Sequence, residues 1–395
     1  MNRFLMTALV IGIVSGCGSS GSAASPSPAT TPGATTAAAS VQPSVAPTIF
    51  PTGAFAALSD DPVPAEVSAK LQAALADTAG GGGITATVMT PDGIWSGSAG
   101  TADGVHDVSA DSQFGIASGT KPIIAAQVMQ LVEAGEISLD APATDYLPAD
   151  FTFDTNGATI RQLLSHRSGI PDWYSDAVEE QVMTDRSRRW ELDEVLALVP
   201  AARRPVGVAH EYTDTNYTLL GLLIEHVRQR PLVEVLRDGV LRVEGTERLI
   251  YQPYEAPTDP MAMPRGEWRD ALKQGGGFLP SMSEASTCGP ACAMASDSIS
   301  LAHWWRAFCA GEIVSEASLT EMSTFYDNEI DYGLGLFNPA QRASVKAVGH
   351  LGASFGYKSS AGCLTEDPLI FVVLTNQDLD SFDLATPLLM AALSD

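Results

Sequence analysis

Segments with the pattern of β-strands lie at both ends of this chain, and helical segments fill the stretch between them. Near the amino end, residues 84–89 and 94–99 flank a Pro-Asp-Gly turn, which predicts a hairpin. Near the carboxyl end, strands are expected at 344–350, 357–364 and 369–375. Strands from the two ends most economically share one antiparallel sheet. The pattern therefore predicts an α+β fold, in which an antiparallel sheet is flanked by helices and an all-helical second lobe packs on one edge.

The clearest predicted helix covers residues 118–134, where apolar residues recur on one face and Gly135 ends the pattern. Further helices are expected to supply the second lobe and to cover the sheet. They are predicted at 64–75, 160–164, 192–198, 217–227 and 384–393.

The first 17 residues have the pattern of an export signal. Arg3 precedes an apolar run at 4–14 that is too short to span a bilayer, and Val-Ser-Gly-Cys ends at Cys17. This ending resembles the bacterial lipobox, in which the cysteine is lipidated and becomes the first residue of the mature protein. The resemblance implies an exported lipoprotein on the outer face of the bacterial cell membrane. A plain secretory signal cleaved nearby is the alternative.

Residues 18–57 are rich in Ser, Ala, Pro and Thr. Such a stretch cannot bury enough apolar area to offset its ordering entropy, so we expect a disordered tether. The folded domain is then predicted to cover 58–395.

The formal net charge of −25 argues against a nucleic-acid partner, because a phosphate backbone would be repelled. The same charge discourages binding to anionic lipid surfaces, so the lipid anchor is the one membrane contact that we expect. The histidines show no metal-ligand spacing. No metal, nucleotide or organic cofactor is expected, and the sequence does not indicate an oligomeric state.

Four cysteines follow Cys17 in the chain. In an oxidising compartment an even number permits disulfides, and four cysteines allow three pairings, among which the sequence does not choose. The closest pair, spaced as Cys-Gly-Pro-Ala-Cys, lacks the second Cys or His pair of a zinc site and is expected to staple a loop. The four are Cys288, Cys292, Cys309 and Cys363.

Ser118 and Lys121 open the longest predicted helix, and a spacing of three places them on one helical face. Burial disfavours the charged form of an amine, and a neutral lysine beside a serine can take its proton and make it a nucleophile. Pro122 fits the first helical turn, where its missing N–H costs nothing. The motif also occurs by chance, and the alternative is an N-cap serine with a solvated lysine.

The surroundings of this pair resemble the penicillin-recognising serine enzymes, in the branch of class C β-lactamases, D-Ala-D-Ala carboxypeptidases and esterases. Five landmarks occur in the order of that family and span most of the chain from about 84 to 376. They are FGIASGTK at 114–121, LLSHRSGIP at 163–171, YTDTNY at 212–217, YGLG at 332–335 and HLGASFG at 350–356. The resemblance implies the β-lactamase/transpeptidase-like fold.

The resemblance also implies roles for individual residues. Ser118 would be the acylated nucleophile, and Lys121 would lower the cost of its deprotonation. Tyr212 would shuttle protons between nucleophile, leaving group and water. The backbone N–H groups of Ser118 and Ala353 would form the oxyanion hole. Gly352 would leave room for a substrate along its strand.

Three residues depart from the family pattern. Asp214 stands where the family has an asparagine, and a carboxylate cannot donate a hydrogen bond to a substrate carbonyl; it can instead hold Lys121 or cap the following helix. His350 replaces the lysine of β-lactamases, and its charge near neutral pH depends on its environment. Leu351 replaces a threonine that helps to bind a substrate carboxylate. We therefore treat Asp214 and His350 as candidate substrate-binding residues and expect weaker recognition of carboxylates.

The expected function is an extracytoplasmic serine hydrolase that forms an acyl-enzyme with amide or ester substrates, of carboxypeptidase or esterase type. Its substrate would be a small molecule or a peptide. The alternatives are a class C β-lactamase and a catalytically weak protein that binds β-lactams or cell-wall fragments.

A competing motif, G-x-S-x-G, places Ser354 between Gly352 and Gly356. The nucleophile elbow of α/β-hydrolases requires a helix after the serine and a histidine later in the chain. Here a strand is predicted next, and no histidine follows. We therefore reject Ser354 as the nucleophile.

Overall fold

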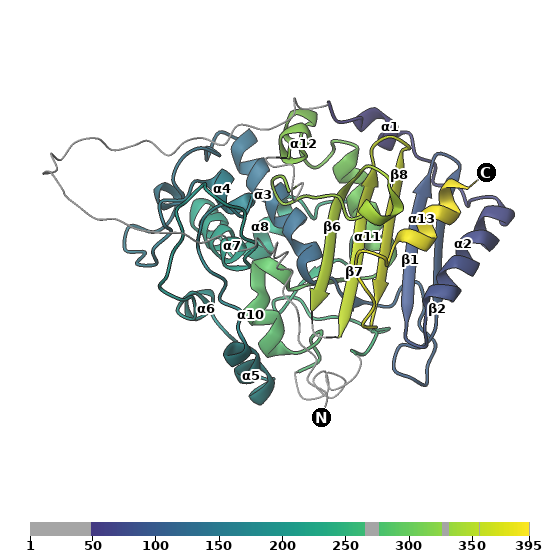
Figure 1. The fold of residues 1–395 in the computed structure, drawn as a ribbon, viewed down its shortest axis with the longest axis horizontal. Coiled ribbons are helices and arrows are strands. Elements are labelled where there is room, and N and C mark those ends of the chain that lie inside the picture. Colours follow the sequence, from purple (N-terminus) through teal and green to yellow (C-terminus); the bar gives the residue numbers. More distant parts are fainter. Residues whose placement is uncertain (1–48, 265–275, 326–331, 355, 395) are drawn as a thin grey trace, which may run out of the picture. The chain divides into compact units, whose positions relative to one another are not determined.

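The five long strands form one antiparallel sheet in the order β2-β1-β8-β7-β6 (Figure 1). They are β1 (Ile84–Thr90), β2 (Gly93–Ala99), β6 (Ala347–Ser354), β7 (Tyr357–Leu364) and β8 (Leu369–Thr375). In the computed structural model the described residues are 49–264, 276–325, 332–354 and 356–394. The first strand pairs with the last, β1 with β8, so the two ends of the chain share the sheet as predicted.

The strand expected at 344–350 lies further along the chain, as β6 over Ala347–Ser354. Its register follows the β6–β7 hairpin, in which Ser354 pairs with Tyr357 and Ala347 with Leu364. The glycines of this segment interrupt the alternation of apolar and polar residues, and pairing with β7 therefore sets the boundaries.

Helices cover both faces of the sheet (Figure 1). Helices α2 (Ala65–Thr78) and α13 (Thr386–Leu393) pack together on one face, and α11 (Ser298–Cys309) packs on the other. The central strand β8 is apolar on both sides for this reason. Leu369, Phe371 and Val373 join the cluster with α2 and α13, whereas Ile370, Val372 and Leu374 join the larger core.

The chain between β2 and β6 supplies the helical part. Its central helices are α3 (Lys121–Glu133), α7 (Thr215–Arg228) and α10 (Met282–Cys292), which contact one another. The shorter elements are α4 (Ile160–Leu164), α5 (Asp176–Thr184), α6 (Leu192–Leu196), α8 (Leu232–Asp238), α12 (Glu316–Met322) and the 3-10 turns η1 (Ala117–Thr120), η2 (Ala143–Tyr146) and η4 (Gln341–Ala343).

A second sheet, which the sequence did not predict, has the order β3-β5-β4. Its strands are β3 (Phe114–Gly115), β4 (Ile250–Tyr251) and β5 (Met294–Ser296). They are two or three residues long, which is too short for a periodic pattern. β3 is followed by η1 after one residue, and pairing of β3 with β5 therefore positions the turn that carries Ser118.

The folded part begins before residue 58, where the sequence placed the end of the tether. Helix α1 (Thr52–Ala56) packs on α11, and Phe50 and Phe55 are buried with ring centroids 5.9 Å apart. Two phenylalanines within the Pro- and Ala-rich segment supply the apolar area that the composition as a whole lacks. The predicted signal, Cys17 and the tether up to residue 48 lie outside the described residues.

Two disulfides pair the four cysteines. Cys309–Cys363 joins α11 to β7 through the core. Cys288–Cys292 lies within α10 and spans a kink at Gly289, whose φ is 44°. This second disulfide therefore bridges a kinked helix, not a loop as predicted. In the part of the chain that the structure describes, no helix has the length and apolar character needed to cross a membrane.

Candidate active site

Ser118 lies on η1, directly before α3. The chain enters this turn through Ala117, which adopts a left-handed conformation with φ of 49° and is buried. A residue with a Cβ rarely adopts this conformation, and such strain is typical of functional sites. Pro122 follows within the first turn of α3, as predicted. The side chain of Ser118 is half-buried and lies beside Lys121.

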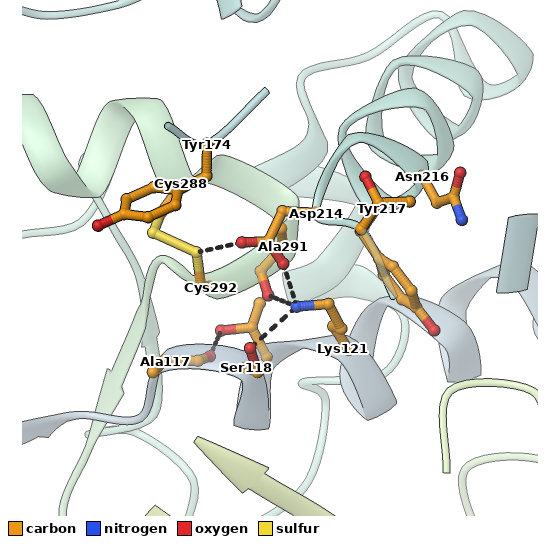
Figure 2. Close-up of polar contacts among 12 residues, drawn as sticks. Ala117, Ser118, Lys121, Tyr174, Asp214, Asn216, Tyr217, Cys288, Ala291 and Cys292 are labelled. Carbon is orange, nitrogen blue, oxygen red and sulfur yellow. Dashed lines mark hydrogen bonds and ion pairs between the residues drawn. A yellow bond between two sulfur atoms is a disulfide. The ribbon is translucent and has the colours of Figure 1, made fainter. Parts of the chain in front are cut away.

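Lys121 is fully buried and donates three hydrogen bonds (Figure 2). Its Nζ lies 3.0 Å from Ser118 Oγ, 2.6 Å from Asp214 Oδ1 and 3.1 Å from the carbonyl oxygen of Ala291. The three acceptors come from η1, the start of α7 and α10. The ammonium group has three N–H donors, which these acceptors and the neighbouring Tyr212 hydroxyl share.

The pKa of Lys121 is raised above its usual value. Burial is the largest influence and lowers it, but the charge of Asp214, then Tyr212 and their hydrogen bonds, outweigh burial. Lys121 is therefore an ammonium in the resting site, where the sequence reasoning expected a neutral amine. The physical reason is the salt bridge to Asp214, a residue 93 positions away in the sequence.

Tyr212 is half-buried beside the same two groups. Its ring centroid lies 4.8 Å from Lys121 Nζ. Burial raises the pKa of Tyr212, while the Lys121 charge and hydrogen bonds with Lys121 and Ser118 oppose the rise. A neutral hydroxyl within reach of both groups can accept one proton and donate another, which is the geometry that a proton shuttle requires.

Asp214 is the N-cap residue of α7, yet its side chain makes no cap hydrogen bond. The carboxylate holds Lys121 instead, which decides between the two alternatives that the sequence left open. Its second oxygen lies 3.8 Å from Cys292 Sγ, so the α10 disulfide borders the salt bridge (Figure 2). Helix α10 approaches α7 closely here, because a Cβ on Gly221 would come within 2.2 Å of Pro290 Cγ.

Ala353 lies on β6, at the edge of the sheet, and is exposed. On this strand, Gly349 exchanges backbone hydrogen bonds of 3.1 and 2.9 Å with Phe337, on the side away from β7. Backbone groups alternate along a strand, so the N–H of Ala353 also points away from β7. β6 packs on η1 at this edge, and the predicted oxyanion donors of Ser118 and Ala353 therefore belong to neighbouring segments.

The packing around Gly352 gives a reason for a glycine that the sequence did not indicate. A Cβ at this position would come within 2.1 Å of the Ile116 carbonyl oxygen and 2.3 Å of Ser359 Oγ. Ser359 Oγ donates to the same carbonyl at 2.7 Å. Gly352 therefore makes room for the segment that precedes the nucleophile, and the predicted space for a substrate stays a prediction.

His350 is buried on β6 with a partner on each ring nitrogen. The residue is 2 % exposed; its Nδ1 lies 2.5 Å from the carbonyl oxygen of Leu351 and its Nε2 lies 3.1 Å from the hydroxyl of Tyr332. Burial, followed by the charge of Lys121, lowers the pKa of His350 to about 3. Both ring nitrogens have protein partners and the imidazole is neutral, so this side chain offers no positive charge to a substrate carboxylate; its substrate-binding role stays a prediction.

Leu351 belongs to a small apolar cluster with Tyr332 and Phe337, against which Tyr212 packs. Tyr332 and Ala291 thus contact predicted site residues, although sequence reasoning assigned neither a role. Tyr332 belongs to the YGLG landmark, and this was the one indication in the sequence that it lies near the site. Ala291 contributes only its backbone carbonyl, which every residue type has, so the sequence could not indicate this role.

The competing motif lies on the β6–β7 hairpin, where Ser354 ends one strand and Tyr357 begins the next. No helix follows Ser354, so this residue lacks the setting of a nucleophile elbow. Within the described ranges, no group of three or more His, Cys, Asp or Glu side chains is placed to hold a metal ion.

Comparison with known proteins gives consistent matches. The sequence model of the Beta-lactamase family matches residues 65–394. Protein flp of Staphylococcus aureus (strain MW2) is 30% identical over 140 residues, which are 34% of this chain and 27% of that protein. Penicillin-binding protein 4 of Amycolatopsis lactamdurans is 34% identical over 158 residues, which are 38% of this chain and 39% of that protein. Each matched stretch thus spans less than half of the relative.

Solved structures match over most of their length. A D-stereospecific amidohydrolase from Streptomyces sp. superposes with a TM-score of 0.69 at 25% identity, covering 82% of this chain and 98% of that one. The D-amino acid amidase of Ochrobactrum anthropi SV3, in complex with D-phenylalanine, has a TM-score of 0.68 at 22% identity, covering 83% and 99%. The second likeness shows the shared fold.

Proposed function

This chain belongs to the beta-lactamase family of serine acyl-enzyme hydrolases, and from that premise we propose that it hydrolyses esters or amides through an acyl-enzyme on Ser118. The observation that carries the proposal is the contact of Ser118 Oγ with Lys121 Nζ at 3.0 Å, with the lysine held by Asp214 and Tyr212 beside both. A nucleophile, a proton carrier and a group that orients the carrier are the parts that nucleophilic catalysis requires.

The proton of Ser118 leaves along a path that conserves the charge of the site. Asp214 takes a proton from Lys121 across 2.6 Å, and the resulting amine takes the proton of Ser118 as its oxygen attacks the acyl carbon. Tyr212 relays a proton to the leaving group. The N–H groups of Ser118 and Ala353 stabilise the oxyanion. Water then releases the acyl group by the reverse sequence of proton transfers.

The site favours acyl donors that lack a carboxylate beside the scissile bond. Of the site residues described above, Lys121 carries the positive charge, and Asp214 already neutralises it. His350 is buried and neutral, and Leu351 is apolar. A substrate carboxylate would meet Asp214 without a compensating cation. We therefore favour an esterase or amidase over a carboxypeptidase or a β-lactamase, and the amidohydrolase and amidase named above agree with this choice.

A second candidate function is slow acylation by β-lactams without turnover. The match to a protein named penicillin-binding protein 4 favours it. Acylation of Ser118 that is not followed by hydrolysis would appear as a burst of one equivalent per enzyme.

We further propose that the protein is exported and lipidated at Cys17, on the basis of the lipobox-like ending of the signal. Mass spectrometry of the mature amino terminus tests this location independently of activity. A diacylglyceryl cysteine at Cys17 is expected, and an unmodified terminus would overturn it.

A substrate panel tests the reaction. Wild type and Ser118→Ala are assayed with a short-chain nitrophenyl ester, a D-amino acid amide, a chromogenic cephalosporin and a D-Ala-D-Ala peptide. We expect turnover of the ester or the amide that disappears in Ser118→Ala. Preferential turnover of the cephalosporin or the peptide would overturn the argument from the missing cation, and activity that survives in Ser118→Ala would overturn the nucleophile.

A further inference from the structure

A chain of hydrogen bonds runs through the buried part of the site from the Tyr212 loop to β6. The N–H of Thr213 donates to His166 Nδ1 at 3.2 Å, and His166 Nε2 lies 3.2 Å from the hydroxyl of Tyr332. The same hydroxyl lies 3.1 Å from His350 Nε2, and His350 Nδ1 lies 2.5 Å from the carbonyl oxygen of Leu351. We call this series the His-Tyr-His chain.

The partners at its two ends fix the tautomer of each histidine. His166 Nδ1 accepts from a backbone N–H, so a neutral His166 carries its proton on Nε2 and donates to Tyr332. His350 Nδ1 faces a carbonyl oxygen, so a neutral His350 carries its proton on Nδ1 and accepts at Nε2. The Tyr332 hydroxyl then accepts from His166 and can donate its single proton to His350. The two histidines are opposite tautomers, and the hydroxyl between them satisfies both.

The chain is built from buried neutral groups. His166 is fully buried, His350 is 2 % exposed and Tyr332 is 6 % exposed. Burial, together with the charges of His210 and Lys121, holds the pKa of His166 well below its usual value. The Tyr217 hydroxyl, which also hydrogen-bonds with Tyr332, donates its own proton to the carbonyl oxygen of Leu164 at 3.2 Å, so its oxygen is a second acceptor for the Tyr332 proton beside His350 Nε2.

One end of the His-Tyr-His chain contacts the proposed proton shuttle, and the other end lies on the strand of the proposed oxyanion donor. The His166 ring packs on the Tyr212 ring with centroids 4.2 Å apart, and Thr213 is the next residue after Tyr212. At the other end, Leu351 lies two residues before Ala353 on β6. Tyr332 also stacks on Phe337, whose backbone pairs with Gly349 of the same strand.

We propose that Tyr332 is a positioning residue, which through His166 and His350 sets the place of the proton shuttle Tyr212 relative to the oxyanion strand β6. The proposal rests on the proposed acyl-enzyme function. Loss of the hydroxyl would leave a donor on His166 and an acceptor on His350 unpaired in the interior. Reorientation of either ring would then move Tyr212 or β6, and a displacement on the order of 1 Å at reacting groups can cost about 100-fold in rate.

Tyr332→Phe tests the role, with Tyr357→Phe as the matched control. Tyr357 is likewise buried and donates one hydrogen bond, of 2.6 Å to the Ala262 carbonyl, but it is not part of the His-Tyr-His chain. Both variants are expected to lose similar stability. We expect Tyr332→Phe to lower kcat on the best panel substrate by about 10- to 100-fold with little change in KM, and Tyr357→Phe to stay within about twofold of wild type.

A second set of variants tests whether the chain acts as a unit. His350→Gln keeps an acceptor for Tyr332 and should retain more activity than His350→Leu. Combining Tyr332→Phe with His350→Leu should cost no more than the worse single change, because either one already interrupts the chain. Additive losses would overturn the proposal, as would a Tyr332→Phe enzyme as active as Tyr357→Phe.

Histidine nitrogen NMR gives a readout that does not depend on turnover. We expect wild type to show one neutral histidine protonated on Nε2 and another on Nδ1, assigned by His166→Asn and His350→Gln, with both signals shifted in Tyr332→Phe. Equal tautomers would overturn the chain itself. A wild type that neither turns over the panel nor reacts at Ser118 with a fluorophosphonate would overturn the proposed function. An active wild type with an equally active Tyr332→Phe would overturn the positioning role alone.

Discussion

Lys121 and His350 are both bases that the fold buries in one site, but Lys121 carries a charge and His350 does not. Burial lowers the pKa of each. Lys121 meets the carboxylate of Asp214 at 2.6 Å, which reverses the effect, whereas His350 meets a tyrosine hydroxyl and a carbonyl oxygen, which do not. The site therefore has a charged side, Lys121 with Asp214 and Ala291, and a neutral side, the His-Tyr-His chain.

The difference shows that buried basic groups can serve two functions, proton transfer and orientation of neighbouring groups. The charged side can transfer a proton, because its acid and base are in direct contact. The neutral side has no counter-charge and can only orient what it touches. Four predictions test this division, in order of decreasing expected effect.

Lys121→Met should have the largest effect, because it removes the proton carrier and leaves Asp214 without its cation. We expect kcat/KM to fall by about 10³-fold or more and the free energy of unfolding to fall by about 3 kcal/mol. Steady-state kinetics and urea unfolding measure the two. Lys346→Met, at a lysine whose side chain is 75% exposed, is the control and should change neither. If Lys121→Met retained more than a tenth of the wild-type activity, Lys121 would not be the proton carrier of the charged side.

The neutral side predicts sensitivity to acid. The folded-state pKa of His350, about 3, lies below its usual 6.5, so the unfolded chain binds a proton more readily. Stability is therefore complete above pH 6.5 and falls as the pH drops towards 3, by a total on the order of 4 kcal/mol for this group. Unfolding of wild type and His350→Gln across this range measures it. An equally steep dependence in His350→Gln would assign the acid sensitivity to other groups.

The two disulfides allow a further test of the charged side, because one borders it and the other lies in the core. In the chain-entropy treatment, Cys288–Cys292 contributes about 2 kcal/mol from a separation of four residues and Cys309–Cys363 about 4 kcal/mol from a separation of 54. The double alanine variant of the first pair should lower kcat about tenfold, because α10 carries the carbonyl that accepts from Lys121.

The double alanine variant of Cys309–Cys363 is the control for this experiment. It should lose more stability yet keep kcat within about twofold of wild type at a temperature where it is folded. Equal losses of kcat in the two variants would show that α10 does not position Lys121.

Asp214→Asn removes the group that takes the proton of Lys121 but also the charge that holds this proton on the lysine, so the amine can lose it to solvent instead. We therefore expect the smallest effect here, on the position of a pH limb. Asp214 raises the pKa of Lys121, so its stabilising contribution is complete below about 10.5 and is lost as the pH rises through the folded-state pKa. Without the carboxylate that pKa falls, and the acid limb of kcat/KM should move to lower pH by about one unit, with lower stability at neutral pH. A pH–rate profile measures the shift. An unmoved limb would mean that Lys121 does not carry the titrating proton.

The sequence predicted the main sheet and predicted that the residues of one proposed site lie close together. Ser118, Lys121 and Tyr212 lie together as expected, and Asp214 takes one of its two predicted positions. Their motifs are local, and a three-residue spacing on one turn already places a serine beside a lysine.

Properties that depend on distant partners were not predictable. The charge of Lys121 depends on Asp214 and that of His350 on complete burial, and neither is visible in a local motif. Gly352 contacts Ile116 across the fold, which spacing within β6 does not indicate. The three-stranded sheet was missed because its strands are too short for a periodic pattern.

The buried amino-terminal segment determines where this protein can be trimmed. Thr52 Oγ1 donates to Glu316, the Phe50 N–H donates to Thr320 Oγ1 at 3.3 Å, and Arg306 binds the carbonyl oxygen of Leu58 at 2.8 Å. A recombinant protein that starts at residue 58 would expose the apolar surface that Phe50 and Phe55 cover, and it should aggregate more readily. A protease that cleaves this chain must likewise cut before Phe50 to leave the buried segment in place.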